Sequence, residues 1–500
     1  MTISLPSFHN GEPISLASVP LLSIREFREE IIAAAGAGAT LTALFGTPAE
    51  SGRVRLFSVL GDPVAGGLAA LSAEVDDAYP CLTVECPQAH WFEREIAEQW
   101  RIEPQGHPWL KPIRFQAPYR PPGRTWARLP GVTDFFAVRG PEVHEVAVGP
   151  VHAGIIEPGH FRFQCHGERV FHLEISLGYQ HRGIEPALVG GPGKRTIHMI
   201  ETLSGDTSIG HATAYCEAME GLGGVAVPAR AQALRAVALE LERLANHTGD
   251  LAALAGDVGY LPTAAYCGRI RGDFLNLTAA ICGSRFGRGM VRPGGVLFDV
   301  DPRLAADLTR RLDNALKDLE DAGRLMWDAP SVQARFQDTG AITAETCAAL
   351  GLVGPAARAC GVERDIRQDF PSGFFRFAQI PISRWSTGDV FARAWVRWLE
   401  IQRSGVFVRE QLASLPHGAI QTPVGAPRPD HLVVVLTEGW RGAIAHVAIT
   451  DPNGRFARYK VIDPSFRNWI GLAIAMREQQ ISDFPLCNKS FNLSYCGHDL

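Results

Sequence analysis

Hydrophobic residues in the middle of the chain recur at helical spacing in three long segments. Apolar side chains at every third or fourth position indicate one buried face of an amphipathic helix. The pattern covers residues 228–249, 303–327 and 389–415. A shorter segment, 209–221, has the same character. We therefore expect the larger part of the chain to have a helical core.

Alternating apolar and polar residues mark strands in two other places. The pattern over residues 160–178 predicts a β-hairpin that turns at 166–168. Three further strands are predicted near the C-terminal end, and the last two are joined by an Asp-Pro-Asn-Gly turn. These strands are 432–436, 443–449 and 456–462.

The first part of the chain has a mixed pattern. It predicts helices at 26–35 and 89–100 and strands at 41–45, 54–59 and 82–85. A stretch rich in Pro, Arg and Gly follows and is typical of an extended linker. The predicted fold class is α+β: a small α+β domain at 1–116, a linker at 117–144, and a mainly helical domain with β-hairpins at 145–500.

The composition of the chain excludes several classes of protein. Of 500 residues, 46% are hydrophobic and 20% are charged, which excludes intrinsic disorder. A net charge of −5 offers no basic surface for nucleic acid. No stretch is apolar enough to span a membrane, and the N-terminus lacks a signal peptide, so we expect membrane association only through partner proteins. The ten cysteines are scattered and are expected to be reduced thiols.

Three polar clusters are candidates for chemistry. Residues 149–163 combine Glu157 with two histidines and Arg162 among turn-forming residues. A carboxyl beside such groups can relay protons, because its neighbours tune its pKa. Residues 177–185 contain His181, and 201–220 contain Asp206. From the residues alone, hydrogen-bonded turns and packed polar side chains explain these clusters at least as well as catalysis does.

The stretches GPVHAGIIEPGHFRF (149–163) and LGYQHRGIE (177–185) resemble signature sequences of a known family. They are similar to the large subunit of energy-converting (group 4) NiFe hydrogenases, of the hydrogenase-4 and formate hydrogenlyase type. That protein resembles the quinone-site subunit of respiratory complex I, and residues 1–116 resemble the small peripheral-arm subunit of the same complex. The resemblance implies the fold of these proteins, with the two subunits fused. Further similar segments are 364–367, 386–393, 438–442 and 459–466.

The resemblance places the four cysteine ligands of a NiFe centre at two pairs of positions. Here they are occupied by Ser204 and Thr207, and by Ser494 and Gly497. Neutral hydroxyls cannot replace thiolates as nickel ligands. We therefore expect no metal on this chain and the loss of hydrogenase chemistry.

Other positions of the family pattern are partly kept. The quinone-binding Tyr of complex I falls on Gly205, and the His corresponds to His160. Glu157 stands where the resemblance places the proton-gate glutamate. The resemblance predicts a polar cavity that conducts protons or binds an acceptor such as a quinone. It would be lined by Glu157, His160, Arg162, His181 and Asp206.

The function implied is that of a large subunit in a membrane-bound oxidoreductase complex, in which electron transfer is coupled to ion translocation. NAD binding and quinone binding are associated with such complexes. The expected partners are a small iron–sulfur subunit like that of complex I, with a 4Fe-4S cluster, and antiporter-like membrane subunits. The expected location is cytoplasmic, peripheral on the inner face of the cell membrane.

Three alternatives stay open. The chain could itself reduce a quinone or another small molecule. It could be a non-catalytic coupling or scaffold subunit. It could also be a NiFe hydrogenase with displaced ligands, such as Cys496, Cys487 and Cys216.

Overall fold

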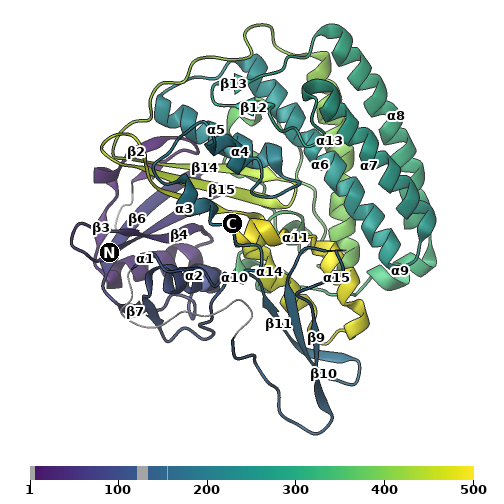
Figure 1. Cartoon of the computed structure of the whole chain (residues 1–500). Coiled ribbons are helices and arrows are strands. Elements are labelled where there is room, and N and C mark those ends of the chain that lie inside the picture. The colour runs from purple at the N-terminus through teal and green to yellow at the C-terminus, as the bar shows by residue number, and fades with distance from the viewer. Residues whose placement is uncertain (1–5, 121–132, 155) are drawn as a thin grey trace.

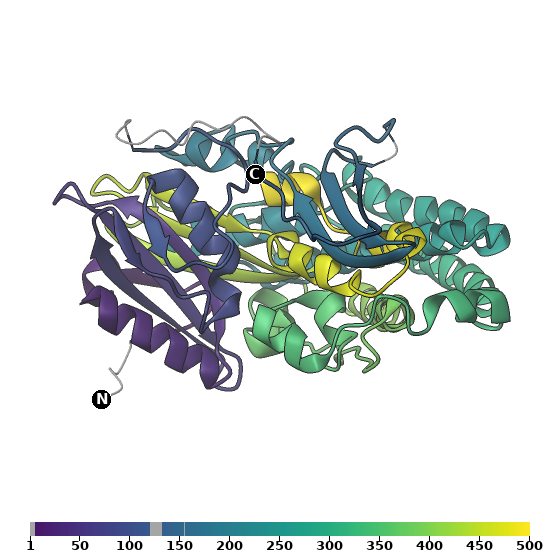
Figure 2. The ribbon, with the colours of Figure 1, turned by 90° about the horizontal axis from the view of Figure 1, so that it is seen from below.

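The computed structural model describes residues 6–120, 133–154 and 156–500. Figure 1 shows a central antiparallel sheet, a small α+β unit on one side of it and a bundle of long helices on the other. Viewed from below, the small unit and the bundle lie at opposite ends of the molecule (Figure 2). The predicted α+β fold class is confirmed.

The N-terminal unit is an antiparallel sheet in the order β1-β6-β5-β4, with β3 added parallel to β6. Ser23 and Glu26 form a capping box that starts its first helix. The predicted helices and two of the strands are confirmed. Its elements are β1 (Ser7–Phe8), β3 (Leu21–Leu22), α1 (Ile24–Gly36), β4 (Thr40–Pro48), β5 (Val54–Asp62), β6 (Gly67–Val75), β7 (Ala78–Pro80), α2 (His90–Trp100) and β8 (Glu103–Gln105).

The strand predicted at 82–85 is wrong, because the segment is a turn. The Glu93 carboxylate accepts hydrogen bonds from the backbone N–H groups of Leu82 (2.8 Å) and Thr83 (2.9 Å). These donors are therefore not available to a β-ladder.

The central sheet has the order β16-β15-β14-β2. It contains β14 (His431–Gly439), β15 (Gly442–Thr450) and β16 (Phe456–Ile462), which confirms the three predicted strands. The edge strand β2 (Pro13–Ser15) comes from the start of the chain, and Ile14 is paired with Leu432. The two ends of the sequence thus share one sheet.

The predicted hairpin is confirmed as β10 (His160–His166) and β11 (Arg169–Ser176). A third strand, β9 (Val143–Val148), pairs with β10. It begins inside the predicted linker, of which residues 121–132 lie outside the described part of the chain. The domain boundaries at 116 and 145 stay predictions.

The three predicted long helices are confirmed, and a fourth, α7, lies among them (Figures 1 and 2). The shorter helix α5 packs against β14 and β15. Over the described residues, no helix combines the length and apolar character needed to cross a bilayer. The remaining elements are α3 (Ile184–Leu188), α4 (Thr196–Ile200), α5 (Ser208–Gly223), α6 (Ala229–Asp257), α7 (Leu261–Cys282), β12 (Val291–Arg292), β13 (Gly295–Val296), α8 (Pro302–Trp327), α9 (Pro330–Phe336), α10 (Ala344–Leu350), α11 (Gly354–Arg358), α12 (Ile366–Asp369), α13 (Val390–Ala413), α14 (Pro464–Ala475), α15 (Phe484–Phe491) and α16 (Tyr495–Asp499).

Candidate functional site

The fold brings together the four positions at which the family resemblance places metal ligands. Ser204 and Thr207 immediately precede α5, while Ser494 caps the N-terminus of α16 and Gly497 lies in that helix. The Ser204 hydroxyl donates to Ser494 Oγ (3.0 Å), and Thr207 Oγ1 donates to Ser204 Oγ (3.4 Å). Ser494 Oγ accepts from the Gly497 N–H at 2.9 Å. Segments 290 residues apart thus form one buried hydroxyl cluster.

These residues do not fit a NiFe centre. A Cβ atom at Gly497 would lie 2.7 Å from Cγ of Asp463, so a cysteine side chain has no room there. Asp463 is held in place, because it accepts from His211 Nε2 (3.0 Å) and from the Ser465 N–H (2.7 Å). The other three positions hold hydroxyls that are occupied by hydrogen bonds to one another. Within the described residues, no group of three or more His, Cys, Asp or Glu side chains is arranged to hold a metal.

An ion pair between buried Arg441 and partly exposed Asp206 adjoins the hydroxyl cluster. Arg441 binds the Asp206 carboxylate through both Nη atoms, at 2.6 and 2.8 Å, and its guanidinium stacks 3.9 Å from the Trp440 ring centroid. Ser204 Oγ and Thr207 Oγ1 each lie 3.2 Å from Asp206 Oδ1, within reach of an alternative hydrogen bond. Burial opposes ionisation, but Arg441 outweighs it and holds the pKa of Asp206 below its ordinary value. The cluster therefore contains one fixed carboxylate charge.

Glu157 is connected to Asp206 through intervening side chains. Its carboxylate accepts from the Tyr495 N–H at 3.2 Å and lies beside the Cys496 thiol. Cys496 Sγ lies 3.4 Å from Ser494 Oγ. Burial and the Glu157 charge raise the pKa of Cys496 to about 11, which keeps it a thiol. We call this continuous row the relay row: Glu157, Cys496, Ser494, Ser204 and Asp206.

The other three predicted site residues lie in different surroundings. His160, on β10, donates from Nδ1 to a backbone carbonyl in the loop before it (3.1 Å). Arg162 pairs with Glu145 of β9 at 2.6 Å. His181 donates to the backbone carbonyl of Asp499 (2.7 Å). In the described part of the chain, their hydrogen bonds do not reach the relay row, and their place in a shared cavity stays a prediction.

The sequence analysis missed the part played by Arg441. This residue stands in the family-like segment 438–442, but its partner Asp206 is 235 residues away. Its one signal in the sequence is the Trp440-Arg441 pair between the strands predicted at 432–436 and 443–449. It does not indicate which carboxylate the arginine binds.

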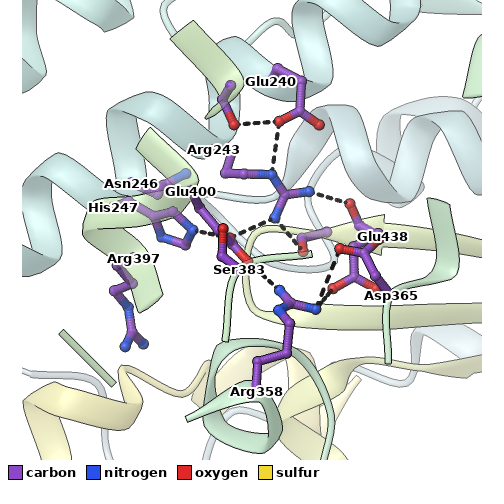
Figure 3. A network of polar contacts seen from close by, with 12 residues as sticks. Glu240, Arg243, Asn246, His247, Arg358, Asp365, Ser383, Arg397, Glu400 and Glu438 are labelled. Atoms are coloured by element: carbon purple, nitrogen blue, oxygen red, sulfur yellow. Dashed lines mark hydrogen bonds and ion pairs between the residues drawn. The ribbon is translucent and has the colours of Figure 1, made fainter. Parts of the chain in front are cut away.

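A second buried network, drawn in Figure 3, adjoins the site where His247 contacts Trp440. Glu400 of α13 accepts from Arg243, His247 and Arg358, and Arg358 also binds Glu438. Burial opposes its charge, but Arg358 and His247 hold the pKa of Glu400 well below its ordinary value. The His247 ring packs edge-on against Trp440, with centroids 6.1 Å apart. The network thus anchors the wall on which Arg441 lies.

The chain is similar in sequence to a family of respiratory-chain subunits and to several known proteins. Residues 257–426 match the model of the respiratory-chain NADH dehydrogenase, 49 Kd subunit family. The chain is 31% identical to the carbon monoxide-induced hydrogenase of Rhodospirillum rubrum over 350 residues, which is 70% of this chain and 97% of that protein. It is 27% identical to formate hydrogenlyase subunit 5 of Escherichia coli (84% of this chain, 77% of that protein). It is 28% identical to NADH-quinone oxidoreductase subunit 4 of Thermus thermophilus (68% and 90%). The resemblance drawn from the motifs is confirmed.

Proposed function

The chain belongs to the family of hydrogenase large subunits and related NADH-quinone oxidoreductase subunits, and from this premise we propose that it is the large subunit of a membrane-bound oxidoreductase complex that has lost hydrogenase chemistry. In this proposal, electron transfer in the complex is coupled to ion translocation. The observation that supports the loss is the hydroxyl cluster at the ligand positions, together with Asp463 in the space that a cysteine side chain in place of Gly497 would need.

The proposal includes partner subunits. An iron–sulfur subunit with a 4Fe-4S cluster would dock near Gly205 and Asp206, because Gly205 is exposed and the Asp206 side chain is 29% exposed at the edge of the buried cluster. Antiporter-like subunits would hold the complex at the inner face of the membrane. The relatives named above, which include subunits of formate hydrogenlyase and NADH-quinone oxidoreductase, support a multisubunit assembly.

Within this chain, the relay row would move protons. Its hydroxyls and its thiol can each donate one hydrogen bond while accepting another, which proton transfer along a row requires. Arg441 keeps Asp206 ionised, so Asp206 marks the hydrogen-bond-accepting end of the row and does not retain a proton. Glu157 lies at the other end of the row. Gln180 donates to Oε1 of its carboxylate (3.1 Å), and the Tyr495 N–H donates to Oε2.

Metal analysis tests the loss of the NiFe centre. Nickel and iron are measured by plasma mass spectrometry on the chain purified with its native partners. We expect iron from the partner and nickel far below one atom per chain. Nickel near one per chain would contradict the proposal. A Cys496→Ser variant would then show whether displaced thiols bind it.

Ion transport tests the relay row. The purified complex is placed in vesicles, and proton movement is recorded for Glu157→Gln and Ser204→Ala. Each variant interrupts the row, so we expect at least a tenfold lower rate. Thr213→Val is the matched control, because the Thr213 hydroxyl is buried in α5 without a hydrogen-bond partner among the described residues. Unchanged transport in all three variants would instead favour a scaffold subunit.

A further inference from the structure

A cavity of about 410 Å³ lies between the N-terminal unit and the central sheet. Its walls are the junction of α1 and β4, the segment 85–88, the segment 348–354 between α10 and α11, and the hairpin of β14 and β15. The lining is mainly apolar, and the volume is in the range of small-molecule sites. The relay row does not take part in this cavity.

The central sheet explains why there is space here. Leu436 and Glu438 of β14 face the cavity, and their cross-strand partners on β15 are Ala445 and Ala443. Alternate residues of a strand share a face, so these four side chains line one wall. Two of the four are alanines, whose short side chains leave the volume unfilled.

Arg467 of α14 brings an unbalanced charge to the wall. It is only 6% exposed, and its Nη2 atom donates to the backbone carbonyls of Leu41 and Thr42 (2.9 Å to Thr42). Among the described residues, no carboxylate forms an ion pair with it, and its Nε and Nη1 atoms have no hydrogen-bond partner. Burial lowers the pKa of Arg467 to about 10. A buried cation normally has a counter-charge, because desolvation is costly.

The remaining charged groups around the cavity are balanced within the protein. Glu85 pairs with Arg28, and Glu438 pairs with Arg358 at 2.8 Å. Asp365 pairs with Arg367 at 2.6 Å, and burial raises the pKa of Asp369 to about 6, although the nearby Arg364 charge partly opposes this. Of the two arginines on the described wall, Arg467 is the one that is buried without an ion pair, whereas Arg364 is partly exposed.

We propose that this cavity binds a small, largely apolar carboxylic acid, with its carboxylate at Arg467 and its apolar body against Ala443, Ala445 and Val353. A carboxylate matches the free N–H groups of a guanidinium and supplies the missing charge. The apolar lining selects a hydrophobic body over a hydrated anion. This inference goes beyond the proposed function and does not depend on it.

Calorimetric titration of the full chain with benzoate tests the proposal. Benzyl alcohol is the uncharged match in shape, and benzylamine is the cationic one. We expect saturable benzoate binding, with a Kd near ~1 mM for a ligand of this size. Both analogues should bind at least tenfold more weakly. Arg467→Gln should weaken benzoate binding at least tenfold, and Arg364→Gln, on the same wall, less than twofold.

A second variant guards against misfolding, since Arg467 also holds β4. Ala445→Leu fills the cavity and leaves Arg467 in place, so it should weaken benzoate binding at least tenfold with the thermal midpoint retained. The proposal is overturned if benzoate does not saturate on the unaltered chain. It is equally overturned if both variants bind benzoate as tightly as the unaltered chain, or if inorganic phosphate displaces benzoate at equal concentration.

Discussion

At Gly497 the backbone passes so close to Asp463 that one added methyl group would lie 2.7 Å from Cγ of the carboxylate. We predict that Gly497→Ala lowers the free energy of unfolding by about 1–3 kcal/mol, as other overpacked core sites do. Gly205→Ala is the control, because a Cβ atom there meets nothing within 4 Å. Denaturant unfolding compares the two variants. Equal stability would mean that Asp463 moves aside freely, and the steric argument against a ligand at this position would fail.

Glu242, which lies beside the hydroxyl cluster, makes the free energy of unfolding depend on pH. Burial raises the pKa of its carboxyl to about 8, although the N–H groups of Ile209 and Gly210 at the start of α5 partly oppose this. Between about pH 4.5 and 8 the folded chain keeps a proton that the unfolded chain has released. The free energy of unfolding therefore falls as the pH rises through this window, by on the order of 5 kcal/mol from this group.

We predict that Glu242→Gln removes this contribution. Urea unfolding of the unaltered chain and the variant from pH 5 to pH 9 isolates it, because the other titrating groups cancel in the difference. The variant should gain stability relative to the unaltered chain as the pH rises, up to about pH 8. Parallel curves would show that Glu242 titrates normally.

At the scale of elements, periodicity predicted α6, α8 and α13 and the strands of both hairpins, whose buried faces are rich in Leu, Ile, Val and aromatic residues. It did not predict β6 or α14, although their buried faces have the same character. It missed α7, because the buried face of that helix includes Thr263 and Cys267, which an apolar pattern does not count. It missed β9, which starts within a segment taken for linker. The motif resemblance placed Glu157 and the four ligand positions. No local pattern could place Arg441 against Asp206, since that pairing depends on the central sheet.

Glu400 joins α13 to α6 and α11 through buried ion pairs with Arg243 and Arg358 (Figure 3). Glu400→Gln would leave the buried Arg358 and Arg243 short of one negative charge. We predict a loss of about 3–5 kcal/mol in the free energy of unfolding. Asp318→Asn, which breaks the exposed pair with Arg269, should cost less than about 1 kcal/mol. Chemical denaturation measures both, and similar losses would contradict the argument from burial.

At the scale of the whole molecule, the N-terminal unit is joined to the larger part by buried contacts. Strand β2 completes the central sheet at its edge. The Asn10 side chain donates to the Leu436 carbonyl (2.9 Å) and accepts from its N–H (2.8 Å). In addition, Glu95 of α2 binds Arg114 and Lys460 of β16, and Lys460 also binds Glu185 at 2.8 Å. Two parts that share a sheet and a buried ionic cluster should unfold together.

We predict that the chain unfolds in one transition, and that Glu95→Gln shifts this transition as a whole to lower temperature. Arg114 and Lys460 are both about 1% exposed and both pair with Glu95. Without the Glu95 charge, these two buried cations are incompletely neutralised, which destabilises the folded chain. Differential scanning calorimetry records the transition, and limited proteolysis follows whether a fragment near 1–116 accumulates. Glu103→Gln is the control, since Glu103 is exposed on the same unit. Two transitions, with only the first shifted by Glu95→Gln, would mean that the N-terminal unit folds independently of the central sheet.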